Sequence, residues 1–385
     1  MSKSDGRLDT PSLAIVLKQY LIDRGMAQGQ LATASGVARA TLSRWLNGHA
    51  VHPYHRGGLL SIAAVLGLRK VEANRLLRAA ELPTIDALAS STDPEEQRLL
   101  QRWLAPVRNN LPAALTSFVG REAEIAEIAE IVCREDVRLV TLTGTGGSGK
   151  TRLALRIARE VLDAFPDGVF FVELAAISEP HLVIPTIAEA IDLRDVLDSA
   201  LNTRLVNWLR SRRVLLLLDN LEHLLHSGPE VASLLREAPG LTVLTTSRIP
   251  LHVYGEYEQP VQPLPLPLLG GSYRELRANP AIELFLQRAQ AANPRYVLDE
   301  EDLPIMAEIC TRLDGLPLAI ELAAARMRGR NPASLLADFP SSLDLASVGP
   351  RDVPRRQQTL RATIAWSVEL LPEATRSLLL RLTVF

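Results

Sequence analysis

The order of apolar and polar residues divides the chain into regions with different periods. From Ser12 to about Ala80, apolar residues recur at the spacing of a helix face, and glycines interrupt the pattern. The glycines that should separate successive helices are Gly25, Gly36, Gly48, Gly57, Gly58 and Gly67. The pattern predicts about five short helices and requires no strand in this region.

From Phe118 onward, strand-like apolar runs alternate with helical ones. The strand-like runs are VRLVTLTG, GVFFVEL, RRVLLLLDN and LTVLTTSR, and the helical ones include TRLALRIAREVLDAF and LVIPTIAEAI. This alternation is typical of a parallel sheet flanked by helices. Beyond the proline-rich segment EQPVQPLPLPLL, helical spacing returns in AIELFLQRAQAA, IMAEICTRL and LAIELAAARM, which predicts a separate helical module.

Residues 84–116 mix small, charged and proline-flanked segments, and only Pro94 to Leu104 has the pattern of a helix. We interpret this stretch as a linker. The predicted fold is therefore multidomain: an all-α bundle over 8–83, a linker over 84–116, an α/β domain with a parallel sheet over 117–268, and a helical domain over 269–350.

Composition places the chain among folded globular proteins, since 47% of its residues are hydrophobic and 22% are charged. Its two cysteines, Cys133 and Cys310, lie in apolar or helical patterns, so no disulfide framework is expected. The N-terminus lacks the apolar core of a signal peptide, and no apolar run reaches the ~18 residues of a membrane span. We expect a cytoplasmic protein without a membrane partner.

Charge is distributed unevenly along the chain. Residues 1–83 hold eleven Lys and Arg against five Asp and Glu, a formal charge of +6, whereas the remainder carries −8. A basic N-terminal region could face nucleic acid.

A phosphate-binding motif follows the first strand-like run. LVTLTGTGGSGKT has the G-x-x-x-x-G-K-T spacing between a β-type and a helical pattern. Its glycines would let backbone N–H groups face phosphate oxygens, Lys150 would contact the β/γ-phosphates, and Thr151 would contact Mg²⁺. The motif predicts a site for ATP or ADP with Mg²⁺, formed by Gly144, Gly146, Gly147, Ser148, Gly149, Lys150, Thr151 and Arg152.

Two more polar residues follow strand-like runs. Asp219 ends RRVLLLLD and could hold the hydration shell of Mg²⁺ together with Thr151, although a helix cap is the alternative. Arg248 ends LTVLTTSR and could sense a γ-phosphate, although it could also be a solvated loop arginine.

Position 220 is Asn, where a hydrolytic enzyme often has a carboxylate that activates water. Glu222 lies two residues further on, in what should be the start of a helix. Lys150, Asp219, Asn220 and Arg248 are therefore candidates for a nucleotide site that hydrolyses ATP slowly at most.

The nucleotide half resembles the STAND class of P-loop ATPases, and in particular its NB-ARC-like group, over residues 117–385. The resemblance assigns Val119, Gly120 and Arg121 of SFVGREAEI to adenine and ribose. It makes Arg248 of TSR the sensor arginine, and it places Pro317 of GLPLAIEL against the adenine.

In that class, ADP keeps the domains closed, and ATP with a sensed ligand opens them for self-association. The resemblance implies that residues 351–385 begin a winged-helix domain and that the family's ADP-holding histidine follows Phe385. RSLLLRLTVF stops within an apolar pattern, so we expect the intact protein to continue. An unknown ligand or protein inducer would then act through a C-terminal sensor outside this chain.

The basic N-terminal region contains a helix, a Gly-centred turn at Gly36, and a second helix from about Ala38 to Leu46. The predicted shared core of this pair is Leu31, Ala32, Val37, Leu42 and Leu46. The residues left on the outward face, where a helix-turn-helix contacts the major groove, are Arg39, Ala40, Thr41 and Arg44.

Residues 12–83 resemble the Cro and XRE-type repressor domains of bacteria. By that resemblance Gln28 would bind a DNA phosphate, and Arg39 and Arg44 would contact bases. That family often has Ser at the N-cap of the recognition helix, where this chain has Ala38. We expect Trp45 to be a core residue.

These features support three hypotheses. The first is a transcription regulator that binds DNA and whose assembly depends on the bound nucleotide. The second is a signalling or defence scaffold whose N-terminal domain recruits protein partners in place of DNA. The third is a catalytic ATPase or motor, which Asn220 disfavours.

Overall fold

The computed structural model describes residues 12–49, 54–193, 201–337 and 376. The chain divides into two compact units: Met1–Arg108 with Val161–Gly168, and Asn109–Glu160 with Val169–Phe385. The winged-helix segment expected over 351–385 lies outside the described residues, except for Arg376.

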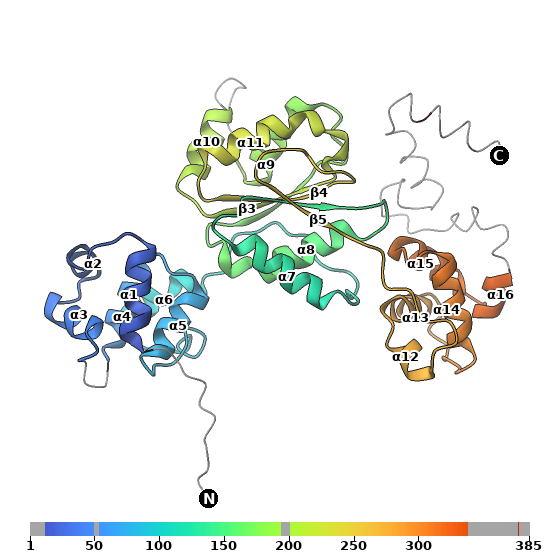
Figure 1. Ribbon diagram of the computed structural model, residues 1–385, viewed down its shortest axis with the longest axis horizontal. Helices are drawn as coiled ribbons and strands as arrows, with labels where there is room; N and C mark the ends of the chain where they lie inside the picture. The colour runs from blue at the N-terminus through green and yellow to red at the C-terminus, as the bar shows by residue number, and fades with distance from the viewer. Residues whose placement is uncertain (1–11, 50–53, 194–200, 338–375, 377–385) are drawn as a thin grey trace, which may run out of the picture. The chain divides into compact units, whose positions relative to one another are not determined.

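The N-terminal unit is helical, as the sequence predicts. Its helices, shown in Figure 1, are α1 (Leu13–Asp23), α2 (Gln28–Ser35), α3 (Arg39–Leu46), α4 (Arg56–Val65), α5 (Lys70–Ala79) and α6 (Pro94–Leu104). Leu17, Leu31 and Leu42 are fully buried in one shared core. Between α2 and α3, Gly36 has a φ of 70°, a left-handed conformation that glycine adopts without a steric penalty.

Gly57 and Gly58 do not separate two helices, contrary to the sequence prediction. Both lie in the first turn of α4, where the His55 side chain accepts a hydrogen bond from the Gly58 N–H. A Cβ atom on Gly58 would lie 3.3 Å from the side chains of Trp45 and Val37. Gly58 therefore allows α4 to pack closely against Trp45 of α3 and against Val37, which precedes α3.

The segment interpreted as a linker also differs from its prediction. Helix α6 forms over the predicted residues, but it packs into the N-terminal core through Leu100 and Trp103, and the preceding Ile85 and Leu88 are buried there too. Trp103 Nε1 donates a hydrogen bond to the Leu68 carbonyl at 2.9 Å. The linker interpretation does not hold for residues 85–104, because the helical pattern of α6 does not indicate which core its apolar side chains join.

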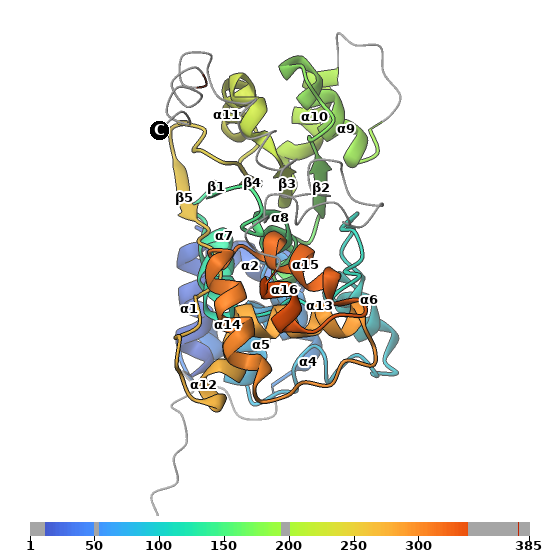
Figure 2. The same cartoon turned by 90° about the vertical axis from the view of Figure 1, so that its right-hand side faces the viewer.

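The second unit contains the predicted α/β domain. Its strands are β1 (Leu139–Thr143), β2 (Val169–Glu173), β3 (Val214–Asp219), β4 (Leu241–Thr246) and β5 (Glu256–Pro260), all parallel, in the order β2-β3-β4-β1-β5. Figures 1 and 2 show α7 (Glu122–Cys133) and α8 (Lys150–Glu160) on one face of the sheet. The other face carries α9 (Val183–Ala190), α10 (Leu201–Arg210) and α11 (Gly228–Glu237).

The two edges of this sheet are built differently. The sequence pattern did not predict the edge strand β5, because most of its side chains are exposed and polar and it pairs only with β1. At the other edge, the Asn110 side chain accepts a hydrogen bond from the Phe171 N–H at 2.6 Å and donates one to the Phe171 carbonyl at 2.9 Å. A side-chain amide thus occupies the outer pairing positions of β2 at that residue.

The predicted helical module follows β5. It consists of α12 (Tyr273–Arg277), α13 (Pro280–Ala292), α14 (Asp302–Arg312), α15 (Pro317–Ala324) and α16 (Pro332–Ala337). A short 3₁₀ helix, Ala325–Met327, lies between α15 and α16. Earlier in the chain, short 3₁₀ helices span Leu162–Ala164, Pro180–Leu182, Leu221–His223 and Leu225–Ser227. Phe285, Met306 and Ile320 are fully buried in the module's own core.

Cys133 and Cys310 are not joined by a disulfide in the structure, and burial raises the pKa of Cys310 to about 12. Across the ranges that the structure describes, no helix has the length and apolar character needed to cross a bilayer.

The packing of Trp103 predicts where the N-terminal domain ends. A fragment of residues 1–108 should unfold cooperatively and at a higher temperature than a fragment of residues 1–83, because the shorter one exposes the core that α6 covers. In the longer fragment, Trp103→Ala should cost about 3–5 kcal/mol, whereas replacing the exposed Gln101 by Ala should cost much less. Thermal melts followed by circular dichroism test this, and equal stability of the two fragments would contradict it.

Candidate functional site

The phosphate loop joins β1 to α8 at the carboxyl edge of the sheet. Gly144 has a φ of 146°, and a Cβ atom on it would lie 2.6 Å from the Val261 carbonyl oxygen, so no side chain fits there. Gly147 and Gly149 also have positive φ angles, whereas Gly146 does not. Ser148 is fully buried, and its Oγ has no hydrogen-bond partner among the described residues.

Lys150 is a buried cation in this loop. Its side chain is 9% exposed, and Nζ donates hydrogen bonds to the carbonyls of Gly144 at 2.8 Å and Thr145 at 3.0 Å. Burial lowers the pKa of Lys150 to about 8. The ammonium group is therefore desolvated without full compensation by the loop, a situation that a bound anion would relieve.

Asp219 ends β3 and is joined to the first turn of α8. Its Oδ1 accepts hydrogen bonds from Thr151 Oγ1 and Thr246 Oγ1, each at 2.7 Å. Thr246 Oγ1 in turn accepts one from the Asn220 N–H at 2.9 Å. Burial raises the pKa of Asp219. Thr246 is a site residue that sequence reasoning missed, although it directly precedes the Ser-Arg of the TSR segment.

The hydroxyl of Thr151 and the carboxylate of Asp219 are hard oxygen donors at 2.7 Å from each other. Such donors suit Mg²⁺, which binds proteins through few side chains and keeps several waters. The unpartnered Ser148 hydroxyl and the buried ammonium of Lys150 suit a phosphate. The residues present thus fit the predicted magnesium nucleotide.

The predicted adenine and ribose contacts lie beside the loop but hold other partners. Arg121, with a φ of 68° at the start of α7, donates hydrogen bonds to the carbonyls of Ser148 at 2.9 Å and Gln262 at 2.6 Å. Val119 packs against the core of the helical module, and a Cβ atom on Gly120 would lie 3.0 Å from Pro280. Their contact with a base remains a prediction.

The GLPL segment lies on the phosphate loop. The Leu318 N–H donates a hydrogen bond to the Gly147 carbonyl at 3.2 Å, and a Cβ atom on Gly149 would lie 3.8 Å from Pro317 Cγ. A Cβ atom on Gly315 would lie 2.3 Å from the Leu264 carbonyl oxygen, so glycine is needed for this approach. Pro317 is therefore next to the loop, and its contact with an adenine stays a prediction.

Arg152 joins α8 to the helical module. Its guanidinium forms an ion pair with Glu321 of α15 at 2.8 Å and donates hydrogen bonds to Thr116 Oγ1 and the Ser117 carbonyl, each at 2.8 Å. Arg288 of α13 contacts the same Glu321 carboxylate at 3.0 Å. These contacts give Arg152 a structural role between two domains, which its position in the motif did not indicate.

Arg248 follows β4 and pairs with the carboxylate of Glu222, for which the sequence pattern indicates no role. Its Nε lies 3.3 Å from Oε1 of Glu222, which belongs to the 3₁₀ helix after β3. The side chains of Arg248 and Glu222 are 16% and 5% exposed. Arg248 is thus not a solvated loop arginine.

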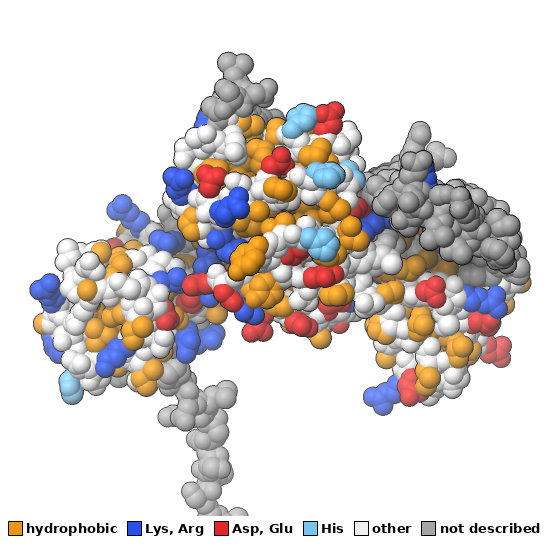
Figure 3. All heavy atoms as spheres, turned by 45° about the horizontal axis from the view of Figure 1, so that its top comes forward, with side chains coloured by type: hydrophobic (Ala, Val, Ile, Leu, Met, Phe, Trp, Pro, Cys, Tyr) orange, Lys and Arg blue, Asp and Glu red, His pale blue; other side chains and the backbone are white. Residues whose placement is uncertain are grey.

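The helix-turn-helix pair leaves the predicted contact residues accessible. Gln28, Arg39, Ala40 and Arg44 are exposed, and Thr41 is half-buried. Figure 3 shows Lys and Arg side chains spread over the N-terminal helical unit. Trp45 is a core residue, 5% exposed and in edge-to-face contact with Tyr54 at 5.9 Å between ring centroids.

Two details of α3 bear on how it could contact DNA: its N-terminal cap and the position of Arg39. Ala38 provides no side-chain cap to α3, as its sequence implies. The Arg39 guanidinium lies over Gly29 of α2, where a Cβ atom would be 2.5 Å from Nη2. The contact of Arg39 with a base stays a prediction.

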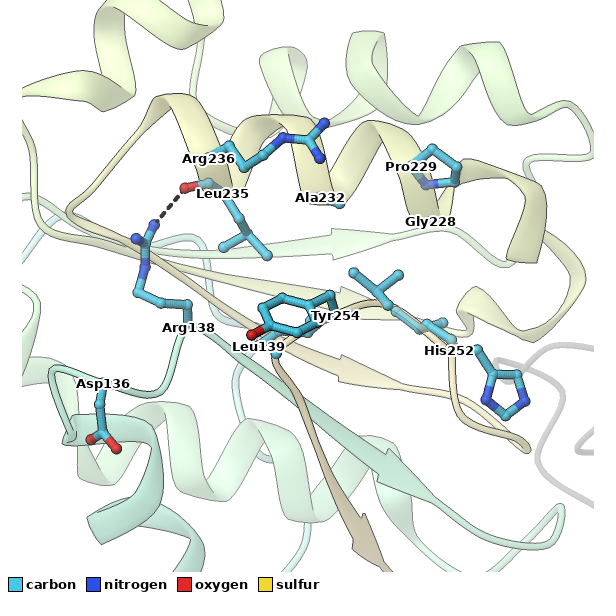
Figure 4. A pocket seen from close by; sticks show the side chains of 13 residues that line it. Asp136, Arg138, Leu139, Gly228, Pro229, Ala232, Leu235, Arg236, His252 and Tyr254 are labelled. Carbon is cyan, nitrogen blue, oxygen red and sulfur yellow. Dashed lines mark hydrogen bonds between the residues drawn. The ribbon is translucent and has the colours of Figure 1, made fainter.

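A cavity of about 660 Å³ lies apart from the nucleotide site, at the opposite end of β1 from the phosphate loop (Figure 4). Its walls come from the start of β1, from α11 and from the loop before β5. Arg138 crosses one wall and donates a hydrogen bond to the Leu235 carbonyl at 3.0 Å.

Comparison with known proteins identifies two domains in this chain. The model of the AAA domain family matches residues 134–258, and the helix-turn-helix model matches residues 17–53. The first match runs from before β1 into β5, and the second includes α2 and α3. Together with the geometry, these matches define a P-loop nucleotide-binding protein of ATPase type with an N-terminal helix-turn-helix domain.

The chain is 38% identical over 283 residues to the uncharacterized protein Rv0894 of Mycobacterium tuberculosis, across 73% of this chain and 69% of that protein. It therefore belongs to the same family as Rv0894. It is 41% identical over 249 residues to Rv0890c of the same organism, whose name assigns it provisionally to the HTH-type transcriptional regulators. That match covers 64% of this chain and 27% of Rv0890c.

Two further similarities are more distant. The regulatory protein AfsR of Streptomyces coelicolor is 27% identical over 265 residues, which is 63% of this chain and 25% of AfsR. The solved structure of the STAND protein PH0952 from Pyrococcus horikoshii, which has a tetratricopeptide repeat sensor, aligns with a TM-score of 0.36 and 16% identity. That alignment covers 73% of this chain and 37% of PH0952.

The pKa of Lys150 predicts how stability changes with pH in the nucleotide-free protein. Below about pH 8 the lysine is protonated in both states, and the folded state bears the burial penalty; above pH 8 only the unfolded state keeps the proton, so stability rises. Lys150→Met removes this rise. The difference in unfolding free energy, variant minus wild type, should therefore fall by roughly 2 kcal/mol from pH 7 to 9.5.

Denaturant titrations at several pH values measure this difference. The exposed Lys18 offers a matched control, because Lys18→Met should show no such pH dependence. A constant difference between Lys150→Met and the wild type over this range would contradict the burial of a charged lysine.

Proposed function

We propose that this chain is a transcription regulator in which the nucleotide at the phosphate loop controls the assembly of a DNA-binding protein. The observation that carries the proposal is the contact of the GLPL segment with the phosphate loop, made by the Leu318 N–H and the Gly147 carbonyl. The occupancy of one loop can thereby act on the position of a separately folded helical module. The similarity to Rv0890c, whose name assigns it provisionally to the HTH-type transcriptional regulators, and to the regulatory protein AfsR supports a role in regulation.

The residues that would hold the nucleotide follow from the site. Lys150 and Ser148 would bind phosphate oxygens, and Thr151 with Asp219 would hold Mg²⁺. The magnesium nucleotide would supply negative charge at the loop. Its third phosphate, present in ATP and absent in ADP, would distinguish the two states of the switch. Lys150 would exchange its loop carbonyls for phosphate oxygens and regain the charge compensation that burial removed.

A switch suits this site better than a motor does. Asn220 adjoins Asp219, and its backbone has a left-handed φ of 63°. The Asn220 N–H donates a hydrogen bond to Thr246, which fixes the backbone of this residue. A hydrolytic enzyme often has a carboxylate at this position to activate water, whereas the Asn220 side chain is uncharged. We infer binding with slow hydrolysis, in which the ADP form persists until a signal promotes exchange.

The magnitudes indicate that the nucleotide does not act alone. Moving a two-state population from 1:99 to 99:1 takes ~5.5 kcal/mol of differential binding, and one hydrogen bond to a charged group contributes ~1.5–3 kcal/mol. Arg248 meeting a γ-phosphate would therefore need help from a sensed ligand. We assign that help to an inducer acting outside the described residues.

DNA binding also depends on assembly in this proposal. A single helix-turn-helix module buries only ~600–1,000 Å² on DNA, and much of its affinity is lost at physiological salt. Self-association in the ATP state would bring two or more copies of α2 and α3 to one site. Assembly thereby converts weak contacts into regulated occupancy.

The nucleotide part of the proposal predicts what the purified protein contains. Mass spectrometry of small molecules released from the full chain should detect ADP or ATP, and Lys150→Ala should remove it, because the loop loses its cation. Lys18→Ala is the matched control and should keep the nucleotide. Hydrolysis should be far below the ~10 s⁻¹ typical of enzymes. An empty wild type without affinity for magnesium adenine nucleotides would refute the switch.

The DNA part predicts an effect of the exposed arginines of α3. Arg39→Ala combined with Arg44→Ala should weaken binding to duplex DNA at least about tenfold, because two cationic contacts are lost. Arg78→Ala, an exposed arginine of α5, should have a much smaller effect. Fluorescence anisotropy at several salt concentrations measures the affinities. An unchanged affinity, or an intact regulatory response without DNA binding, would favour a protein-recruiting scaffold.

A further inference from the structure

Arg248 and Glu222 extend the ends of two adjacent strands. Arg248 lies two residues after β4, and Glu222 lies three residues after β3, so both stand at the carboxyl edge that carries the phosphate loop. Their ion pair, 3.3 Å from Nε to Oε1, is nearly excluded from solvent, with the Glu222 side chain only 5% exposed. Exposed ion pairs contribute little to stability, but this pair is not exposed.

The chain fixes Glu222 through its neighbours. Asn220 has a left-handed backbone and is bonded to Thr246, and Leu221 is fully buried in the core between the sheet and its helices. The turn formed by these two residues brings the Glu222 carboxylate back toward the end of β4. Its position therefore follows from the local fold and does not depend on a flexible loop.

Half of the Glu222 carboxylate remains unsatisfied. Oε2 is buried and has no hydrogen-bond partner within the described parts of the chain. A buried carboxylate with one open oxygen depends on its remaining cationic partner, because loss of that partner would leave an uncompensated charge. Separation of the pair is thus unfavourable unless another group takes over one of the charges.

The pair is also coupled to the phosphate loop. Burial is the largest influence on the pKa of Lys150, but Glu222 raises that pKa and Arg248 lowers it. Two cations, Lys150 and Arg248, and two carboxylates, Asp219 and Glu222, thus share one buried cluster. A phosphate added to this cluster would bring new negative charge that competes with Glu222 for Arg248.

We propose that Glu222 is a positioning residue that restrains Arg248 and so reduces the preference of the site for a nucleoside triphosphate over a diphosphate. This inference rests on the proposed nucleotide site. While Arg248 is paired with Glu222, contact with Arg248 adds little to the affinity for a third phosphate. The new contact would form only if the buried ion pair were broken. A signal that weakened the pair would raise the preference for the triphosphate without any new ligand contact.

The test uses the full chain and four variants: Glu222→Gln, Glu222→Asp, Arg248→Gln, and the double variant Glu222→Gln with Arg248→Gln. Titration calorimetry would measure the affinities for Mg²⁺ with ADP and with the non-hydrolysable triphosphate AMP-PNP. Glu130→Gln, which removes an exposed carboxylate on α7, is the matched control. The readout is the ratio of the two affinities, which a general loss of stability would not change selectively.

Glu222→Gln should raise the preference for AMP-PNP over ADP by roughly tenfold, the effect of one added contact to a charged group. Glu222→Asp keeps the charge and should remain closer to the wild type. Arg248→Gln should lower the preference, and adding Glu222→Gln to it should change nothing further, because the carboxylate acts through the arginine. Glu130→Gln should match the wild type.

Three results would overturn the inference. The first is a ratio unchanged by Glu222→Gln, even if hydrolysis of ATP slows, since the carboxylate would then activate water and not restrain the arginine. The second is an equal effect of Glu222→Gln with and without Arg248. The third is a wild type that binds neither nucleotide, which refutes the nucleotide site itself and can be told apart from the first two.

Discussion

The nucleotide-binding half of the structure depends on one buried charge. The ammonium group of Lys150 is held by two carbonyls of its own loop, at a depth where desolvation already shifts its protonation. The glycines of the loop allow its backbone to close around the Lys150 ammonium group. Hydrogen bonds to Asp219 from Thr151 and Thr246 fix the ends of β3 and β4 beside this group. A partly compensated cation in a rigid cradle is what makes the site responsive to an anion.

The same loop is also a structural support for the helical module. The Leu318 N–H uses the Gly147 carbonyl, and Arg152 and Arg288 both contact the single carboxylate of Glu321. Ligand binding and domain attachment therefore share a few backbone atoms and side chains. The helical module, which folds around its own core, is thus attached next to the atoms of the phosphate loop.

The sequence was sufficient for features with a local signal. Helical period, continuous apolar strands and the glycine spacing of the loop predicted the bundle, the sheet and the position of Lys150. The rest depends on tertiary contacts that leave no periodic trace. The polar strand β5 exists because β1 pairs with it, α6 joins the N-terminal core through a few large side chains, and Arg152 and Glu222 acquire their partners only when distant segments meet.

The Asn110 amide at the edge of β2 bears on how copies of this protein can associate. By occupying both main-chain groups of Phe171, it denies a strand from another molecule the hydrogen bonds needed to extend the sheet there. Amyloid-like or swapped edge pairing is disfavoured at that position, even at high local concentration. Among the described strands, β5 at the opposite edge pairs with β1 alone, so this protection belongs to the β2 edge.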